Sequence, residues 1–135
     1  FLLPHYQHVV GKARSRQERR LFFHVDTDGR AEPAVPLYLE AGMDVMSPWE
    51  VASGCDVVEV GRKWPELVLA GGIDKRVLAD GPKAIDRHVE RIIPAMIERG
   101  GYIPTCDHGV PDNVSLANYL HYRRRVCELD GVKAE

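Results

Sequence analysis

Short strand-like runs alternate with segments of helical periodicity along most of the chain. The runs combine apolar, aromatic and β-branched residues, and turn residues close them. They are LFFHV (21–25), MDVMS (43–47), LVLAGG (67–72) and GYIPT (101–105). This pattern predicts four short strands, each followed by a helix.

The segments between these runs carry helix signals. The clearest begins at Asp80-Gly81-Pro82 and ends at Gly100-Gly101. Its apolar residues recur at the spacing of one helix face: Ile85, Val89, Ile92, Ile93 and Met96. Shorter helices are predicted over 36–41 and 50–63, and a helical segment precedes the first strand. Ser115 is the expected N-cap of a last helix over 116–129, whose inward residues are predicted to be Leu116, Tyr119, Leu120 and Cys127.

A helix followed by four strand–helix units predicts an α/β fold. Short strands connected by helices form a parallel sheet that is covered by helices. Two architectures satisfy this order, an open doubly wound sheet and a (β/α) barrel of the TIM type. About four units would make half of an eight-unit barrel.

Polar and ionisable residues follow every predicted strand. The four exits read His24-Val25-Asp26-Thr27-Asp28, Ser47-Pro48-Trp49-Glu50, Gly71-Gly72-Ile73-Asp74-Lys75-Arg76 and Cys106-Asp107-His108. In both candidate folds the carboxyl ends of the strands carry the chemistry. The sequence therefore predicts an active site at this end of the sheet.

Composition narrows the class of protein. The chain has 135 residues, a net charge of −2 and 44% hydrophobic residues, which is typical of a single globular domain. A near-neutral chain gives no reason to expect nucleic acid or anionic lipid as a partner, and no apolar run approaches the roughly 20 residues that cross a bilayer. Three widely spaced cysteines favour a reducing, cytoplasmic setting over a disulfide framework. Because the chain starts at Phe1 inside a helix-forming segment, it is interpreted as a piece of something longer.

His108 is the first candidate for chemistry, since an imidazole can act as a general acid or base near neutral pH. Asp107 points the other way on an extended backbone, which makes it a poor partner for orienting the ring. The alternative is a loop histidine that makes only local hydrogen bonds.

His24 and Asp26 alternate along one strand and therefore face the same side. With Cys106 from the last strand, they offer the nitrogen, oxygen and sulfur ligands of a three-residue zinc site with one open position. The alternative is an Asx-type turn at Asp26-Thr27-Asp28-Gly29 and a cysteine that only fills space.

Asp74, Lys75 and Arg76 follow two glycines. A Gly-Gly turn lets backbone N–H groups approach an anion, and either cation could hold a carboxylate. A solvated pair of charges at a helix start is the alternative.

The longer segments resemble a known family. SPWEVASGCDVVEVGRKWPELVLAGGIDKRVLA and AIDRHVERIIPAMIERGGYIPTCDHGVPDNVSLANYLHYRR are similar to the C-terminal half of the uroporphyrinogen decarboxylase family, which also contains corrinoid-dependent and thiol methyltransferases. The resemblance implies that residues 1–135 are the C-terminal part of a (β/α)8 barrel. His108-Gly109 is similar to the histidine–glycine segment that closes the decarboxylase pocket, and Asp74 lies where the decarboxylases have Gly-Asn-Leu-Asp-Pro.

The resemblance implies a decarboxylase as the first function. The substrate would be a carboxylated tetrapyrrole or a related small molecule, and no cofactor would be required. His108, Asp26 and Asp74 are then the predicted catalytic residues. The predicted substrate-binding residues are Lys75, Arg76 and Glu50.

Two alternatives stay open. The methyltransferase branch holds zinc on a His-x-Cys pair and a later Cys, which His24, Asp26 and Cys106 match in part, and it implies a corrinoid protein or a thiol as partner. The third possibility is an inactive half-barrel that assembles as a homodimer or with a missing N-terminal half.

Overall fold

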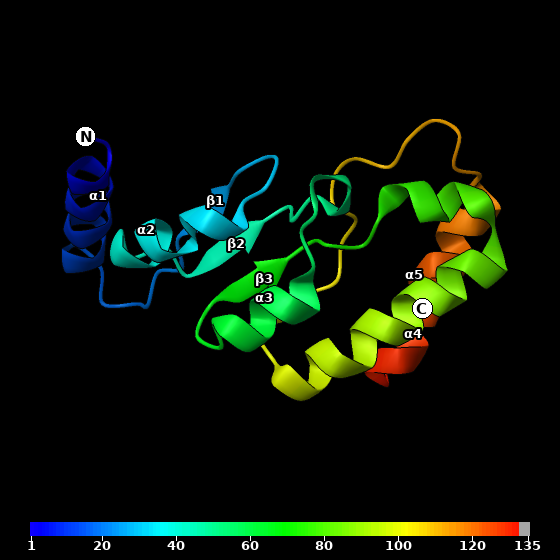
Figure 1. Cartoon of the computed structure of the whole chain (residues 1–135). Helices are drawn as coiled ribbons and strands as arrows, with labels where there is room; N and C mark the ends of the chain where they lie inside the picture. Colours follow the sequence, from blue (N-terminus) through cyan, green and yellow to red (C-terminus); the bar gives the residue numbers. More distant parts are fainter. Residues whose placement is uncertain (133–135) are drawn as a thin grey trace.

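In a computed structural model of the chain, the structure describes residues 1–132 (Figure 1). Five α-helices and four strands follow one another in the order that the sequence pattern predicts. The helices are α1 (Leu3–Ser15), α2 (Val35–Glu40), α3 (Val57–Lys63), α4 (Pro82–Arg99) and α5 (Leu116–Asp130). The strands are β1 (His24–Asp26), β2 (Val45–Ser47), β3 (Val68–Ala70) and β4 (Tyr102–Ile103), and single 3₁₀ segments cover Glu32–Ala34, Val51–Ser53 and Lys75–Asp80.

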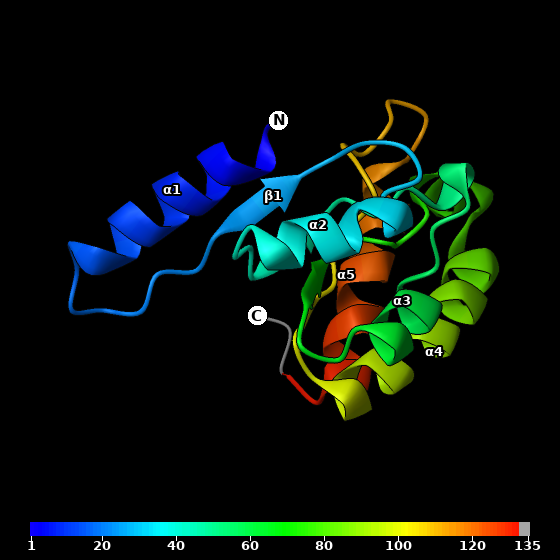
Figure 2. The same ribbon diagram turned by 60° about the vertical axis from the view of Figure 1, so that its left-hand side comes forward.

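The strands form one parallel sheet whose spatial order, β1-β2-β3-β4, equals their order along the chain. This confirms the predicted α/β fold and matches part of a (β/α) barrel. Within residues 1–132, β1 and β4 each pair on one side only. Figure 1 shows α1 and α2 beside β1 at one end of the molecule and α4 and α5 at the other, and Figure 2 shows α1 standing clear of α3, α4 and α5.

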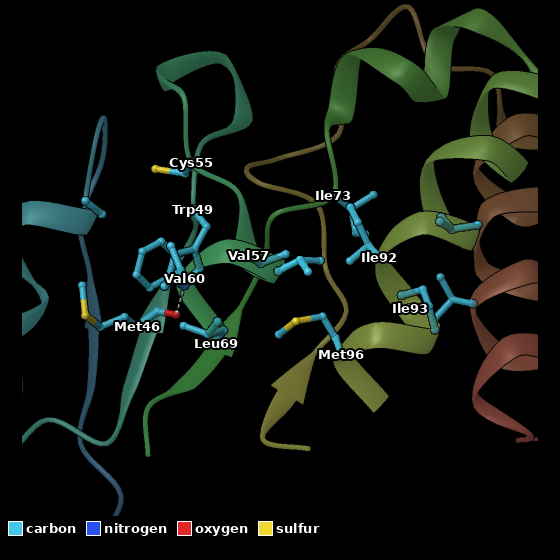
Figure 3. Close-up of a cluster of buried hydrophobic side chains, with 14 of the residues drawn as sticks. Met46, Trp49, Cys55, Val57, Val60, Leu69, Ile73, Ile92, Ile93 and Met96 are labelled. Atoms are coloured by element: carbon cyan, nitrogen blue, oxygen red, sulfur yellow. Dashed lines mark hydrogen bonds between the residues drawn. The ribbon is translucent and has the colours of Figure 1, made fainter. Parts of the chain in front are cut away.

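The main core lies between the sheet and helices α3, α4 and α5. The predicted apolar face of α4 is buried there, with Ile85, Val89 and Ile92 each fully shielded from solvent. Figure 3 shows the side chains of this core, among them Met46, Leu69 and Met96. Trp49 is fully buried and its indole N–H donates to the carbonyl of Met46 (2.8 Å), so this residue packs in the core. A smaller cluster of Val10, Ala41 and Met43 attaches α1 to the rest.

The predicted helix over 50–63 is wrong in its first half. A 3₁₀ turn ends at Gly54, which has a left-handed φ of +86°. Helix α3 then begins after Asp56, whose carboxylate accepts hydrogen bonds from the N–H groups of Val58 and Glu59. The side-chain cap therefore restarts the helix seven residues later than the apolar spacing indicated.

Two of the residues predicted to face inward on α5 are exposed instead. Leu116 is 71% exposed and Leu120 49% exposed, whereas Tyr122 and Val126 are buried. Because α5 packs mainly on α4, the helix is rotated to place Tyr122 at the centre of its inner face. None of the helices within residues 1–132 combines the length and apolar character needed to cross a membrane.

Arg99 is the main polar anchor at the end of the sheet opposite the exits. Its guanidinium donates to six backbone carbonyls, those of Gly61, Trp64, Pro65, Leu67, Gly100 and Gly101. These carbonyls belong to the end of α3 and to the segments that enter β3 and β4. One side chain thus holds three connections together.

We expect Arg99→Met to lower the free energy of unfolding by about 3 kcal/mol, because several carbonyls lose a charged donor at once. Urea denaturation of the purified variant measures the loss. The matched control is Arg62→Met, whose exposed pair with Glu59 should cost about 0.5 kcal/mol or less. Equal losses for both variants would contradict the anchoring role of Arg99.

Candidate active site

The loops that leave β1, β2 and β4 meet at His108. Its Nε2 lies 2.8 Å from Oε1 of Glu50 and 3.3 Å from Oδ1 of Asp28. Glu50 follows β2, and Asp28 follows β1. The predicted convergence of the strand exits is therefore present, and it is centred on this imidazole.

Glu50 is held so that one carboxylate oxygen faces His108. Its other oxygen accepts hydrogen bonds from the backbone N–H of Gly29 (2.6 Å) and from the hydroxyl of Ser53 (3.0 Å). These donors, with the Gly29 N–H the strongest, hold the pKa of Glu50 below its usual value. Glu50 is thus an anion at neutral pH, and it stabilises the positive charge that His108 gains when the ring is protonated.

His24 and Asp26 meet at Ser47 on the neighbouring strand. The Ser47 hydroxyl donates to Oδ2 of Asp26 (2.6 Å), and Nε2 of His24 lies 2.8 Å from the same hydroxyl oxygen. Since the single hydroxyl proton goes to Asp26, Nε2 of His24 is the donor in its own contact. In the neutral ring this leaves Nδ1 of His24 as the unprotonated nitrogen.

Asp107 is a structural residue of the site that the sequence reasoning passed over. Its side chain is 1% exposed and accepts hydrogen bonds from the N–H groups of Val51 (2.9 Å) and Lys75 (3.1 Å). The ammonium of Lys75 lies 3.7 Å away. The backbone bends at residues 107–109 instead of staying extended, and Asp107 and His108 contact different partners. Its carboxylate ties the exits of β2 and β3 to that of β4, so it fixes the loop on which His108 stands.

Asp74 and Arg76 are engaged with each other. The Asp74 carboxylate is largely buried and accepts hydrogen bonds from the backbone N–H, Nε and Nη2 of Arg76, at 2.7 to 2.9 Å. The side-chain hydrogen bond from Arg76 is the main reason why the pKa of Asp74 lies below its usual value. Lys75 points to Asp107 and is only 24% exposed. Both cations are thus close to the exits, each with an acidic partner.

Asp74→Asn should remove a contribution to stability that depends on pH. Because the pKa of Asp74 is lowered by folding, this contribution is present above the unfolded pKa of about 3.9 and is lost as pH falls through the folded value. Urea denaturation at pH 7, 4 and 3 should therefore show a difference between parent and variant that shrinks in acid.

The matched control for Asp74→Asn is Asp112→Asn. Asp112 is exposed and forms no ion pair within the described part of the chain, so this change should leave the unfolding free energy near that of the parent. If the free energy of unfolding of Asp74→Asn stayed below that of the parent by the same amount from pH 7 to pH 3, the ionic role of Asp74 would be contradicted.

The proposed zinc ligands are not brought together. Cys106 forms an isolated β-bridge with Ile73, beyond the end of β3. Within residues 1–132 the ligand atoms of His24, Asp26 and Cys106 do not lie within 4.8 Å of one another. Burial, followed by the charge of Asp107, raises the pKa of the Cys106 thiol to about 11, which disfavours the thiolate that zinc needs. These residues therefore do not fit the metal. The one set of possible ligands that does meet within the described residues is Asp28, Glu50 and His108.

The backbone segments that follow β2 and β3 approach each other closely. Gly71 has a φ of +114°, and the N–H of Gly72 donates to the carbonyl of Pro48 (2.9 Å). A Cβ placed on Gly71 would lie 2.0 Å from that same carbonyl oxygen. Trp49 next to it has a φ of +60°, in the left-handed region. The exits of β2 and β3 are thus held together two residues before Glu50.

Sequence reasoning assigned roles to His108 and Glu50, which the structure brings together. It assigned no site role to Asp28, Ser47 or Asp107, although all three belong to the strand exits that it singled out. The available signal for all three was their place at or just beyond the end of a strand. Their partners could not be read from that position, because each contact joins segments that are more than 20 residues apart.

Comparison with known proteins points to one family. The family model described as uroporphyrinogen decarboxylase (URO-D) matches residues 1–128. The uroporphyrinogen decarboxylase of Rhodococcus erythropolis is 37% identical over 119 residues, which is 83% of this chain and 32% of that protein. Those of Rhodococcus jostii and of a Hydrogenobaculum species are 34% and 24% identical, over 83% and 81% of this chain and 32% and 29% of their own. The chain therefore spans about a third of the length of these relatives.

Proposed function

The chain belongs to the uroporphyrinogen decarboxylase family, and we propose that it carries the proton-donating part of a decarboxylase site. The substrate class is a carboxylated tetrapyrrole, as the names of its relatives indicate for those proteins. The observation that carries the proposal is the contact of His108 Nε2 with the carboxylates of Glu50 (2.8 Å) and Asp28 (3.3 Å).

This arrangement suits acid-catalysed loss of CO2 from an acetate side chain on a pyrrole ring. A proton adds to a ring carbon, and the resulting positive charge accepts the electron pair of the bond to the leaving carboxylate. A second proton then adds to the side-chain carbon that lost CO2, and the ring carbon releases the proton that it had taken up. Each acetate thus becomes a methyl group with the net uptake of one proton. The protonated ring itself takes up the electrons, and under this proposal no cofactor is required.

His108 is the proposed proton donor and Glu50 its positioning residue. With Nε2 engaged by Glu50 and Asp28, Nδ1 of the protonated ring is the nitrogen left to deliver a proton. The two carboxylates stabilise the imidazolium, and the ring regains its proton from solvent after each transfer. Lys75 and Arg76, close to the same exits, are the proposed contacts for the remaining carboxylates.

Decarboxylation is tested by incubating the chain with uroporphyrinogen without oxygen and separating the oxidised porphyrin products by their number of carboxylates. We expect products with fewer carboxylates than the substrate, formed in proportion to the released CO2. Unchanged substrate, at protein concentrations where the chain is assembled, would refute the proposed function.

Glu50→Gln should lower the decarboxylation rate by about tenfold, because the amide keeps the geometry but removes the charge that stabilises the imidazolium. The matched control is Glu66→Gln, an exposed glutamate that precedes β3 at the opposite end of the sheet, which should leave the rate unchanged. A rate for Glu50→Gln equal to that of the parent would remove Glu50 from the mechanism.

Zinc-dependent methyl transfer, with a corrinoid protein or thiol as partner, is the competing function, and the misfit of His24, Asp26 and Cys106 weighs against it. Elemental analysis of protein purified without added metal separates the two. Zinc near one equivalent that is lost in Cys106→Ala would favour methyl transfer over decarboxylation.

The two open edges of the sheet support a further proposal, that the chain functions as a homodimer. Strands β1 and β4 leave backbone donors and acceptors free on their outer sides within residues 1–132. Pairing of two copies would supply eight strands, the number of a closed barrel. Sedimentation should show a dimer, and the activity per chain should rise with protein concentration. A monomer that lacks activity at high concentration would instead support an inactive half-barrel.

A further inference from the structure

A small pocket next to His108 lies between the exit of β4 and helix α5, and Glu50 is not part of its lining. Its volume is about 240 Å³. The residues that line it come from 105–110 and from two turns of α5: Thr105, Cys106, His108, Gly109, Val110, Tyr119, Tyr122 and Arg123. Because sites for drug-sized ligands measure about 300–1,000 Å³, this pocket fits one small group and not a whole macrocycle.

The lining is free of acidic side chains and rich in donors. Thr105 and Tyr119 carry hydroxyl groups. The Cys106 thiol, with its pKa raised to about 11, stays neutral at physiological pH. Arg123 is the fixed cation, and within the described residues it forms no salt bridge, unlike its neighbour Arg125, which pairs with Asp86, Glu90 and Glu128. The pocket therefore has a positive charge, that of Arg123, which no acidic side chain pairs with in the described part of the chain.

Arg123 is positioned by a rigid neighbour. Its guanidinium carbon lies 5.9 Å from the ring centroid of Tyr122, within the range of a cation–π contact. Tyr122 is 1% exposed, and its hydroxyl donates to the carbonyl of Pro104 (3.2 Å). The ring of Tyr119 lies against Tyr122 with centroids 6.1 Å apart. The aromatic pair thus forms one wall of the pocket and supports the cation at its mouth.

We propose that this pocket binds an aliphatic carboxylate, with Arg123 as the charged donor and Tyr119 as a second donor. A guanidinium presents N–H groups in the plane that a carboxylate requires, which favours this anion over a neutral group of the same size. Binding of the carboxylate itself is independent of the proposed decarboxylation. Its assignment as the site for an acetate or propionate arm of the substrate rests on that proposed function, and places the arm beside His108.

Propionate is the probe for this site. Titration of the ¹⁵N-labelled chain with sodium propionate, at ionic strength held constant with sodium chloride, should shift the amide signals of Cys106, Gly109, Tyr119 and Arg123 along one saturable curve. Arg123→Gln should weaken binding by about tenfold through loss of a charge-assisted hydrogen bond. Because Arg123 is exposed, the variant should keep the parent fold, which the unchanged signals of the core verify.

Arg124→Gln is the matched control, since Arg124 is the next residue of α5, is also exposed, and within residues 1–132 hydrogen-bonds only to the carbonyl of Leu120. It should bind propionate as the parent does. The proposed carboxylate site would be refuted if Arg123→Gln bound propionate as tightly as the parent. It would also be refuted if both variants weakened propionate binding equally, or if the parent showed no saturable shifts. These results do not depend on activity: propionate binding without CO2 release refutes only the decarboxylase, and CO2 release without propionate binding refutes only the pocket.

Discussion

His108→Asn is expected to lower the rate of uroporphyrinogen decarboxylation by about a hundredfold to ten-thousandfold, the usual contribution of a positioned general acid. Asparagine is of similar size and can still donate a hydrogen bond to Glu50, but it cannot deliver a proton. Since His108 is exposed and lies in a loop, the unfolding free energy should change little. The measurement is the initial rate of CO2 release at saturating substrate.

The matched control for His108→Asn is His8→Asn. His8 is exposed on α1 and is not among the residues that contact His108 within the described part of the chain. This change should leave the rate of CO2 release at the parent value. A decarboxylation rate of His108→Asn within threefold of the parent would rule out His108 as the proton donor, whatever the fate of the carboxylate pocket.

Gly71→Ala is expected to lower the free energy of unfolding by about 4 kcal/mol or more, enough to prevent accumulation of folded protein. The added Cβ would lie 2.0 Å from the carbonyl oxygen of Pro48, and the φ of +114° is one that alanine rarely adopts. Backbone segments on both sides of the contact would have to separate, and Trp49 would lose its packing with them. Circular dichroism and urea denaturation of the soluble fraction measure the effect.

Gly109→Ala is the matched control for Gly71→Ala. Gly109 lies in the loop after β4, and a Cβ placed there meets no heavy atom within 4 Å. We expect its unfolding free energy to stay within about 0.5 kcal/mol of the parent. Comparable stability of the two alanine variants would show that the close approach of Gly71 to Pro48 is absent in solution.

The parallel sheet could be predicted from the sequence because its cause is local. Short apolar runs separated by helices require parallel strands, and the apolar face of α4 is buried as its spacing predicted. The gathering of polar residues at one edge follows from the same cause, since parallel strands all end at the same side. His108 and Glu50 were found in this way.

The contacts within the site could not be predicted, because they depend on spacing across the sheet. His24 on β1 and Cys106 after β4 are separated by two strands, and three strand spacings amount to about 14 Å, too far for one metal ion. His108 reaches Asp28 because both stand on loops that extend beyond the strands. The contact of Asp74 with Arg76 is different, because it joins residues two apart at the start of the 3₁₀ segment Lys75–Asp80.

The wrong prediction for the inner face of α5 has a similar origin. Leu116 and Leu120 satisfy helical spacing, but the packing of α5 on α4 selects the face that carries Tyr122 and Val126. Periodicity identifies a helix with apolar residues, but α5 has such residues on two sides, and its sequence alone does not show which side is buried. The packing of α5 on α4 determines which side that is.

The meeting of three strand exits at one imidazole is the central claim, and nuclear Overhauser effects from the ring protons of His108 test it most directly. In the chain with ¹³C-labelled side chains, we expect cross-peaks from the His108 ring to the side-chain protons of both Glu50 and Asp28, given Nε2–oxygen distances of 2.8 and 3.3 Å. Cross-peaks to residues of its own loop alone, with none to Glu50 or Asp28, would contradict it.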